Sequence, residues 1–161
     1  MKSTLPEHIR LRMQQCRQKV GCIRMWLNRK FLSMTLQPIG DGEQLARFVL
    51  FSKHICTSGQ RVKPDAFIPH PHSDLSVTRH NGFSEKQLWN IGRKVAIQRK
   101  RTLYGRADVS ATTVRQQSLK VEPKPLKGNP NHANILGWPT EKSAQKIIAQ
   151  ELAAASVFIK L

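Results

Sequence analysis

The 161-residue sequence predicts a small single α+β domain with four to five helices and a short mixed or antiparallel sheet, preceded by a basic amphipathic N-terminal helix. Two observations carry this prediction. Apolar residues recur at helical spacing in several segments, and short β-prone pieces bounded by turn residues lie between them. The hydrophobic content of 39% over this length is enough for one core of ordinary size. We therefore expect a helical extension at residues 1–38 and a compact α+β domain at residues 39–161.

The clearest periodicity lies in residues 8–34, where apolar residues recur every three or four positions along one helical face. Arginines and lysines occupy the other faces. A helix of this kind packs on its own domain, pairs with another helix, or lies on an anionic membrane surface. If it binds a protein partner or a second copy of the chain, we expect the contact through Ile9, Met13, Val20, Ile23 and Leu27.

Turn residues at positions 36–42 end this segment, and a second helix is expected over residues 43–53. Residues 61–79 then favour short strands around 66–68 and 75–78. Ser84 and Gln87 have the spacing of a capping box, which predicts a helix that starts at residue 85 and ends at residues 104–106.

The remaining elements alternate in type. We expect a short helix over residues 110–117, a strand at 119–121 and a long loop over residues 127–139, which are rich in Gly, Pro and Asn. A last helix should follow Thr140, and residues 157–161 should form a strand.

Charge is the strongest functional signal. The formal net charge is +17, from 27 lysines and arginines against 10 aspartates and glutamates. Self-repulsion of this size does not favour folding, so the excess indicates a polyanionic partner, in the first place nucleic acid, either RNA or DNA. Residues 86–106 contain no carboxylate. The predicted nucleic-acid-binding residues are Lys86, Arg93, Lys94, Arg99, Lys100, Arg101 and Arg106.

Histidines supply the main alternative. His132 lies among asparagines in the expected loop, where an imidazole could act as a general base, and we take it as the candidate catalytic residue. His70 and His72 form the sharpest pattern for a metal site, together with His80 and His132. Flanking prolines favour polyproline geometry, in which side chains two residues apart do not align, so no metal is predicted.

The sequence therefore predicts a nucleic-acid-binding protein with largely sequence-independent phosphate contacts. A small metal-independent ribonuclease or transferase-type toxin that uses loop histidines is one alternative, and a helix-mediated assembly protein is another. No phosphate-loop motif occurs, so no cofactor is expected. No apolar stretch reaches the roughly 18 to 20 residues of a transmembrane helix and no signal peptide is apparent, so a cytoplasmic location is expected.

Overall fold

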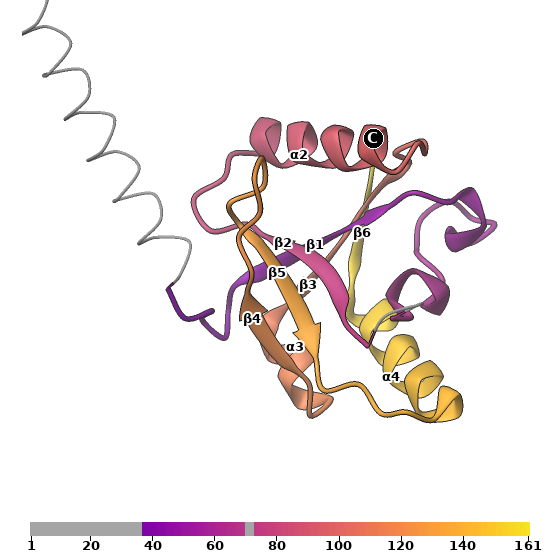
Figure 1. Cartoon of the computed structure of the whole chain (residues 1–161). Coiled ribbons are helices and arrows are strands. Elements are labelled where there is room, and N and C mark those ends of the chain that lie inside the picture. Colours follow the sequence, from indigo (N-terminus) through magenta and orange to yellow (C-terminus); the bar gives the residue numbers. More distant parts are fainter. Residues whose placement is uncertain (1–36, 70–72) are drawn as a thin grey trace, which may run out of the picture. The chain divides into compact units, whose positions relative to one another are not determined.

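The computed structural model describes residues 37–69 and 73–161, which form a six-stranded antiparallel sheet with helices on both faces (Figure 1). The compact unit runs from Gln37 to Leu161. The strands lie in the order β4-β5-β2-β1-β3-β6. Their bounds are β1 Gln44–Val49, β2 Leu75–Arg79, β3 Gly105–Ser110, β4 Lys120–Pro123, β5 His132–Leu136 and β6 Val157–Lys160. The helices are α2 Glu85–Gln98, α3 Ala111–Gln116 and α4 Lys142–Ala155, with 3-10 turns η1 Ser52–His54 and η2 Pro64–Phe67.

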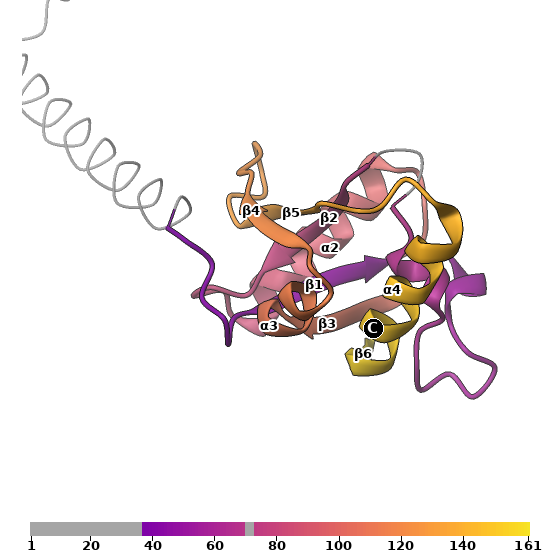
Figure 2. The same cartoon turned by 90° about the horizontal axis from the view of Figure 1, so that it is seen from below.

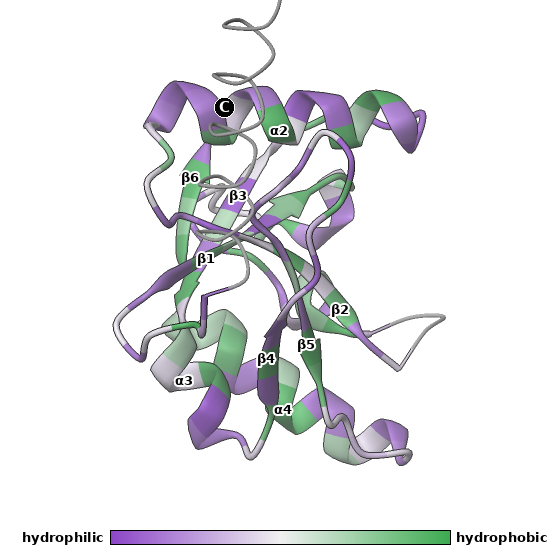
Figure 3. Cartoon of the chain, turned by 60° about the vertical axis from the view of Figure 1, so that its left-hand side comes forward, coloured by the Kyte–Doolittle hydropathy of each residue, from purple (hydrophilic) through white to green (hydrophobic). Residues whose placement is uncertain are grey.

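The main hydrophobic core lies between the sheet and the layer of α3, α4 and η2 (Figure 2). Its fully buried side chains include Leu45, Phe67, Val109, Ile135 and Leu152. The opposite face of the sheet carries α2, along which hydrophilic and hydrophobic residues alternate (Figure 3). Gly92 of α2 approaches β1 so closely that an added Cβ would lie 2.8 Å from Cε1 of Phe48. The two faces of the sheet are therefore covered in different ways.

Alternation along the strands assigns side chains to these faces. Leu75 and Val77 of β2 belong to the main core, as do Ala133 and Ile135 of β5. Because successive side chains of a strand point to opposite faces, the residues between them turn toward the α2 side. Those residues are Ser76, Thr78, His132 and Asn134. This half of the sheet thus has an apolar face and a polar one.

The sheet is split between its two central strands. β1 and β2 pair at only two positions, Leu45↔Arg79 and Ala46↔Thr78. Beyond them β1 continues along β3 while β2 continues along β5. Arg47 bridges the gap, because its Nη1 donates to the carbonyl of Ser76 and its Nε to the carbonyl of Ala66, each at 2.9 Å. A strand carbonyl without a ladder partner on β1 is in this way satisfied by a side chain.

On the α2 face of the sheet, Arg106 fastens α2 to β3. Its side chain is only 3% exposed and donates to both carboxylate oxygens of Asp108 on the strand, at 3.1 and 3.0 Å. It also forms a two-point ion pair with Glu85 in the first turn of α2, at 2.7 and 2.8 Å. The guanidinium carbon lies 4.8 Å from the ring centroid of Trp89. Hydrogen bonding by Arg106 lowers the pKa of Glu85.

The α+β class is confirmed, but the expected four to five helices are wrong, since the described residues hold three α-helices. The expected helix at residues 43–53 is strand β1 followed by η1. Apolar residues at positions 45, 46, 48 and 49 fit a helical face, yet they fit equally well a central strand that is covered on both sides. The sheet contains six antiparallel strands, more than a short sheet would.

Three further boundaries differ from expectation. The helix after Ser84 ends at Gln98, and residues 105–110 form β3. β5 runs through the expected loop at residues 127–139, and the expected strand at 66–68 overlaps the 3-10 turn η2. The predicted N-terminal helix, with its apolar stripe from Ile9 to Met34, lies outside the described residues, so the division at residues 38 and 39 stays a prediction. Within the described ranges, every helix is too short or too polar to span a bilayer.

The Arg106 contacts predict a large cost for removing this guanidinium. Arg106→Met leaves Asp108 as a buried carboxylate without its cation, and breaking a buried pair in this way costs about 3–5 kcal/mol. Arg93→Met on the exposed side of α2 should change stability by less than about 0.5 kcal/mol. Urea unfolding of both variants measures the difference, and equal stabilities would contradict the anchoring role of Arg106.

Candidate functional site

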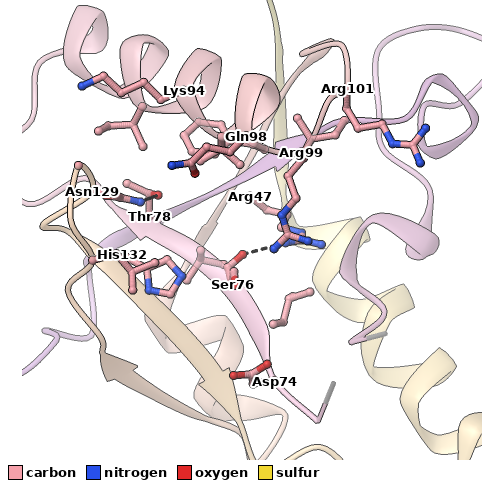
Figure 4. A pocket seen from close by; sticks show the side chains of 18 of the residues that line it. Arg47, Asp74, Ser76, Thr78, Lys94, Gln98, Arg99, Arg101, Asn129 and His132 are labelled. Carbon is pink, nitrogen blue, oxygen red and sulfur yellow. Dashed lines mark hydrogen bonds between the residues drawn. The ribbon is translucent and has the colours of Figure 1, made fainter. Parts of the chain in front are cut away.

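A cavity of about 550 Å³ opens on the α2 side of the sheet, next to the gap between β1 and β2 (Figure 4). Its walls come from β1, β2, the C-terminal half of α2, the residues around η1 and the connection between β4 and β5. Small-molecule sites in proteins have volumes of about 300–1,000 Å³. The cavity therefore has room for a ligand of the size of one nucleotide.

One side of the cavity is uncharged and polar. Ser76 and Thr78 of β2, Gln98 of α2 and Asn129 all line it. The side-chain nitrogen of Asn129 donates to Oγ1 of Thr78 at 2.8 Å, which fixes the amide. Its buried Oδ1 has no hydrogen-bond partner among the described residues. The wall thus offers hydroxyl and amide groups beside a firmly held Asn129.

His132, on the same wall, is held in one tautomer. Its Nδ1 lies 2.7 Å from the carbonyl oxygen of Lys124. A carbonyl only accepts, so Nδ1 carries the proton and Nε2 keeps its lone pair. Burial, together with the charge of Lys124, lowers the pKa of His132 and outweighs the hydrogen bond to Lys124, which raises it. The imidazole is therefore neutral near pH 7, with Nε2 able to accept a proton or a hydrogen bond.

Cations from separate parts of the chain converge on the cavity. Its lining residues include five with fixed positive charge, namely Arg47, Lys94, Arg99, Arg101 and Lys127. Among the described lining residues Asp74 is the single carboxylate, and it lies 3.9 Å from Lys124 Nζ and accepts from Asn134. None of the five cations has a carboxylate within ion-pair distance in the described part of the chain. The cavity therefore has a large excess of positive charge.

The C-terminal end of α2 positions three of the predicted binding residues, Arg99, Lys100 and Arg101. The helix closes in a Schellman motif, in which the amide of Arg101 donates to the carbonyl of Ala96 and the amide of Lys100 to that of Ile97. Lys100 has a φ of 50°, the left-handed conformation that glycine usually supplies at this position. Arg99 and Arg101 flank it and both line the cavity. A lysine held here at a conformational cost suggests a use for its charge.

A second hollow of about 330 Å³ continues from the end of α2 toward η1. Lys53, Lys100 and Arg101 line it, together with Phe51, which also lines the main cavity. Two cations lie near the ring of Phe51, with the Arg101 guanidinium carbon 4.9 Å and Lys53 Nζ 5.8 Å from its centroid. The aromatic and the cations thus form one continuous surface.

The structure separates the predicted binding residues into three groups. Lys94, Arg99 and Arg101 line the main cavity and Lys100 the second hollow, whereas Lys86 and Arg93 are exposed on α2 but line neither. Arg106 is buried in the ion-pair network beneath α2, so its charge is already neutralised. His132, the candidate catalytic residue, lies in β5 at the cavity.

Other predicted residues lie elsewhere, and important ones were missed. His80 is 3.3 Å from Asp108, and His70 and His72 lie outside the described residues. No three His, Cys, Asp or Glu side chains are grouped as metal ligands in residues 37–69 and 73–161. The sequence did not single out Arg47, Phe51 or Lys127. Only the pairing of the strands brings them together with the end of α2.

Comparison with protein-family models, curated protein sequences and solved structures finds no match to this chain. The geometry and charge of the cavity are therefore the basis for inferring a function.

The left-handed position of Lys100 predicts opposite effects for the same substitution at two sites. Lys100→Gly relieves the left-handed strain and should stabilise the domain by about 1 kcal/mol. Lys94→Gly, in the exposed middle of α2, should destabilise it by about 1 kcal/mol. Thermal unfolding of the two variants compares them directly. A loss of stability in Lys100→Gly would show that the lysine side chain makes a stabilising contact that outweighs the strain.

Proposed function

We propose that this protein binds nucleic acid, with phosphate contacts made by the basic border of the cavity and the end of α2. The observation that carries the proposal is the convergence of five unpaired cations on a cavity with one carboxylate among its described lining residues. Phosphate oxygens are the natural partners of such a surface, because guanidinium and ammonium groups donate strong charge-assisted hydrogen bonds to them. The formal charge of +17 supplies a long-range attraction to the same polyanion.

Stabilisation of the α2 dipole explains the position of only some of the five cavity cations. Cations near the C-terminus of a helix stabilise its dipole by about 0.3–1 kcal/mol, which covers Arg99 and Lys100. It does not cover Arg47 of β1 or Lys127 of the β4–β5 connection, which approach the cavity from other elements. Lysine and arginine side chains from several elements around one concave surface favour a shared anionic ligand.

Charge reversal at the cavity tests the proposal. The variant Lys94→Glu, Arg99→Glu, Arg101→Glu and Lys127→Glu should bind labelled RNA or DNA more weakly and with a smaller salt dependence. Each lost phosphate contact reduces the slope of log affinity against log salt by about 0.7 for single strands and about 0.9 for duplex DNA. Fluorescence anisotropy at several salt concentrations measures both quantities.

The matched control reverses four exposed cations that line neither hollow, Lys86, Arg93, Lys142 and Lys146. Its net charge equals that of the cavity variant, although it reverses three lysines and one arginine instead of two of each. We expect the control to keep most of the affinity and of the slope. If both variants lose affinity and salt slope equally, binding depends on net charge alone, and the cavity is not the binding surface.

A second candidate function is metal-independent cleavage or modification of RNA, and the orientation of His132 favours it. The neutral imidazole has its lone pair on Nε2, as a general base for a 2′-hydroxyl requires. Arginines in the same cavity could stabilise the charge that develops on a phosphate during attack. This candidate adds chemistry to the binding proposed above and uses the same surface.

Incubation of labelled RNA with the protein in excess chelator tests this candidate. If His132 is a base, His132→Ala should lower the rate by roughly two to four orders of magnitude and leave binding nearly unchanged. His54→Ala, which changes another histidine that lines the cavity, is the control. The rate should rise with pH as the imidazole loses its proton, and the midpoint of the rise should lie below pH 6.5, because the pKa of His132 is lowered from that value. Absence of any product would remove the candidate.

A further inference from the structure

We propose that the cavity is specific for single-stranded nucleic acid, with one phosphate between Arg47 and Arg99 and a neighbouring base stacked on Phe51. This inference rests on the proposed function and assigns the form of nucleic acid and the contacts of one nucleotide unit. It is carried by two independent features, an anchored arginine with unused donors and an exposed aromatic ring that lines the same cavity.

Arg47 is positioned to hold an anion. A guanidinium has five N–H donors, and two of those on Arg47 are used by the carbonyls of Ser76 and Ala66. The other three have no hydrogen-bond partner in the described part of the chain. Both partners are main-chain carbonyls. They hold the guanidinium in place, and its positive charge is not neutralised by a carboxylate. It is therefore preorganised for a ligand that accepts several hydrogen bonds.

Arg99 brings a second guanidinium to the same place (Figure 4). Burial, followed by the positive charge of Arg99, lowers the pKa of Arg47 to about 10. Two arginines this close repel each other, and the nearest acid of the cavity wall, Asp74, is engaged with Lys124 and Asn134. A phosphate between the arginines would replace the repulsion with two attractions and could receive hydrogen bonds from both.

Phe51 offers a surface for a base. It is 37% exposed, although large apolar side chains are usually buried, and it lines both hollows. The cation–π interaction with Arg101 and Lys53 is weak at an exposed site and accounts for only part of this placement. Exposed aromatics beside cations that track a backbone are the usual arrangement for binding single strands.

The concave shape explains the expected preference for single strands. In a duplex the bases are stacked and paired, so their faces are not available to Phe51. The sugar-phosphate backbone of a duplex also presents a broad convex surface that cannot follow a recess between a helix and a sheet. An unpaired nucleotide can enter the recess with its phosphate and turn its base toward the ring.

The test compares a labelled single-stranded RNA and DNA with the corresponding duplexes, using fluorescence anisotropy at one salt concentration. The wild-type chain should bind at least one single strand roughly tenfold or more tightly than its duplex. Phe51→Ala should remove most of this preference, with single-strand affinity lower by roughly fivefold or more. Ile97→Ala is the control, because Ile97 is 75% exposed on α2 and lines neither hollow.

A second arm tests the phosphate contact. Arg99→Gln should weaken single-strand binding clearly more than Arg93→Gln, which removes the same group from a position of α2 outside the cavity. Titration with inorganic phosphate and with a nucleoside monophosphate then distinguishes a free phosphate site from a nucleotide site. The nucleotide should compete with the single strand at lower concentration than phosphate does, and Arg99→Gln should reduce that difference.

The outcomes separate this inference from the proposed function. Equal binding of single strands and duplexes, with Phe51→Ala like Ile97→Ala, would overturn the inference and leave nucleic-acid binding intact. Equal effects of Arg99→Gln and Arg93→Gln would overturn the phosphate contact. If the wild-type chain binds neither form of nucleic acid, the proposed function fails together with the inference. Circular dichroism of each variant ensures that a loss of binding is not a loss of fold.

Discussion

The early separation of β1 and β2 is the constraint on which the cavity depends. A ladder that continued past Ala46 and Thr78 would pair the carbonyl of Ser76 with β1 and leave no space for Arg47. The gap instead requires a long side chain with several donors, and arginine supplies them while keeping its charge. The break in the sheet therefore opens a recess and also places a fixed cation in its wall. An arginine is rarely buried in a central strand unless its donors are paired.

The α2 layer completes the recess because the helix is held unevenly. Its first turn is fastened to β3 through Glu85 and Arg106, and its middle packs on Phe48 at Gly92. Its final turn has no comparable ion pair among the described residues and carries Arg99 at the mouth of the cavity. At the start of α2 the buried ion pair attaches the helix to the sheet. At its end the unpaired charge of Arg99 is available to a ligand.

Local signals in the sequence predicted the local structure well. The capping box at Ser84 and Gln87 is present, α4 and β6 form in the expected segments, and α3 lies within the expected residues 110–117, although Ile147, expected on the core face of α4, is exposed. The failures concern strands whose identity depends on distant partners. β3 contains Arg106 and Asp108, which look like surface residues in the sequence, yet they pair with each other, and Arg106 also pairs with Glu85 of α2. The sequence alone shows a cluster of cations near residue 100. It does not show that Arg47 and Phe51 lie near them, because strand pairing brings these distant segments together.

The strand order has a consequence for the rate at which this domain acquires its structure. β1 pairs with β3, β2 with β5 and β3 with β6, so most of the ladders join segments that are far apart along the chain. Only β4 and β5 are close neighbours in sequence. Loop-closure entropy must be overcome before such distant pairs contribute, and domains of this kind fold in milliseconds to seconds instead of microseconds. During that interval a highly cationic chain repels other copies of itself, and this repulsion protects its unpaired strand edges from aggregation until the sheet is complete.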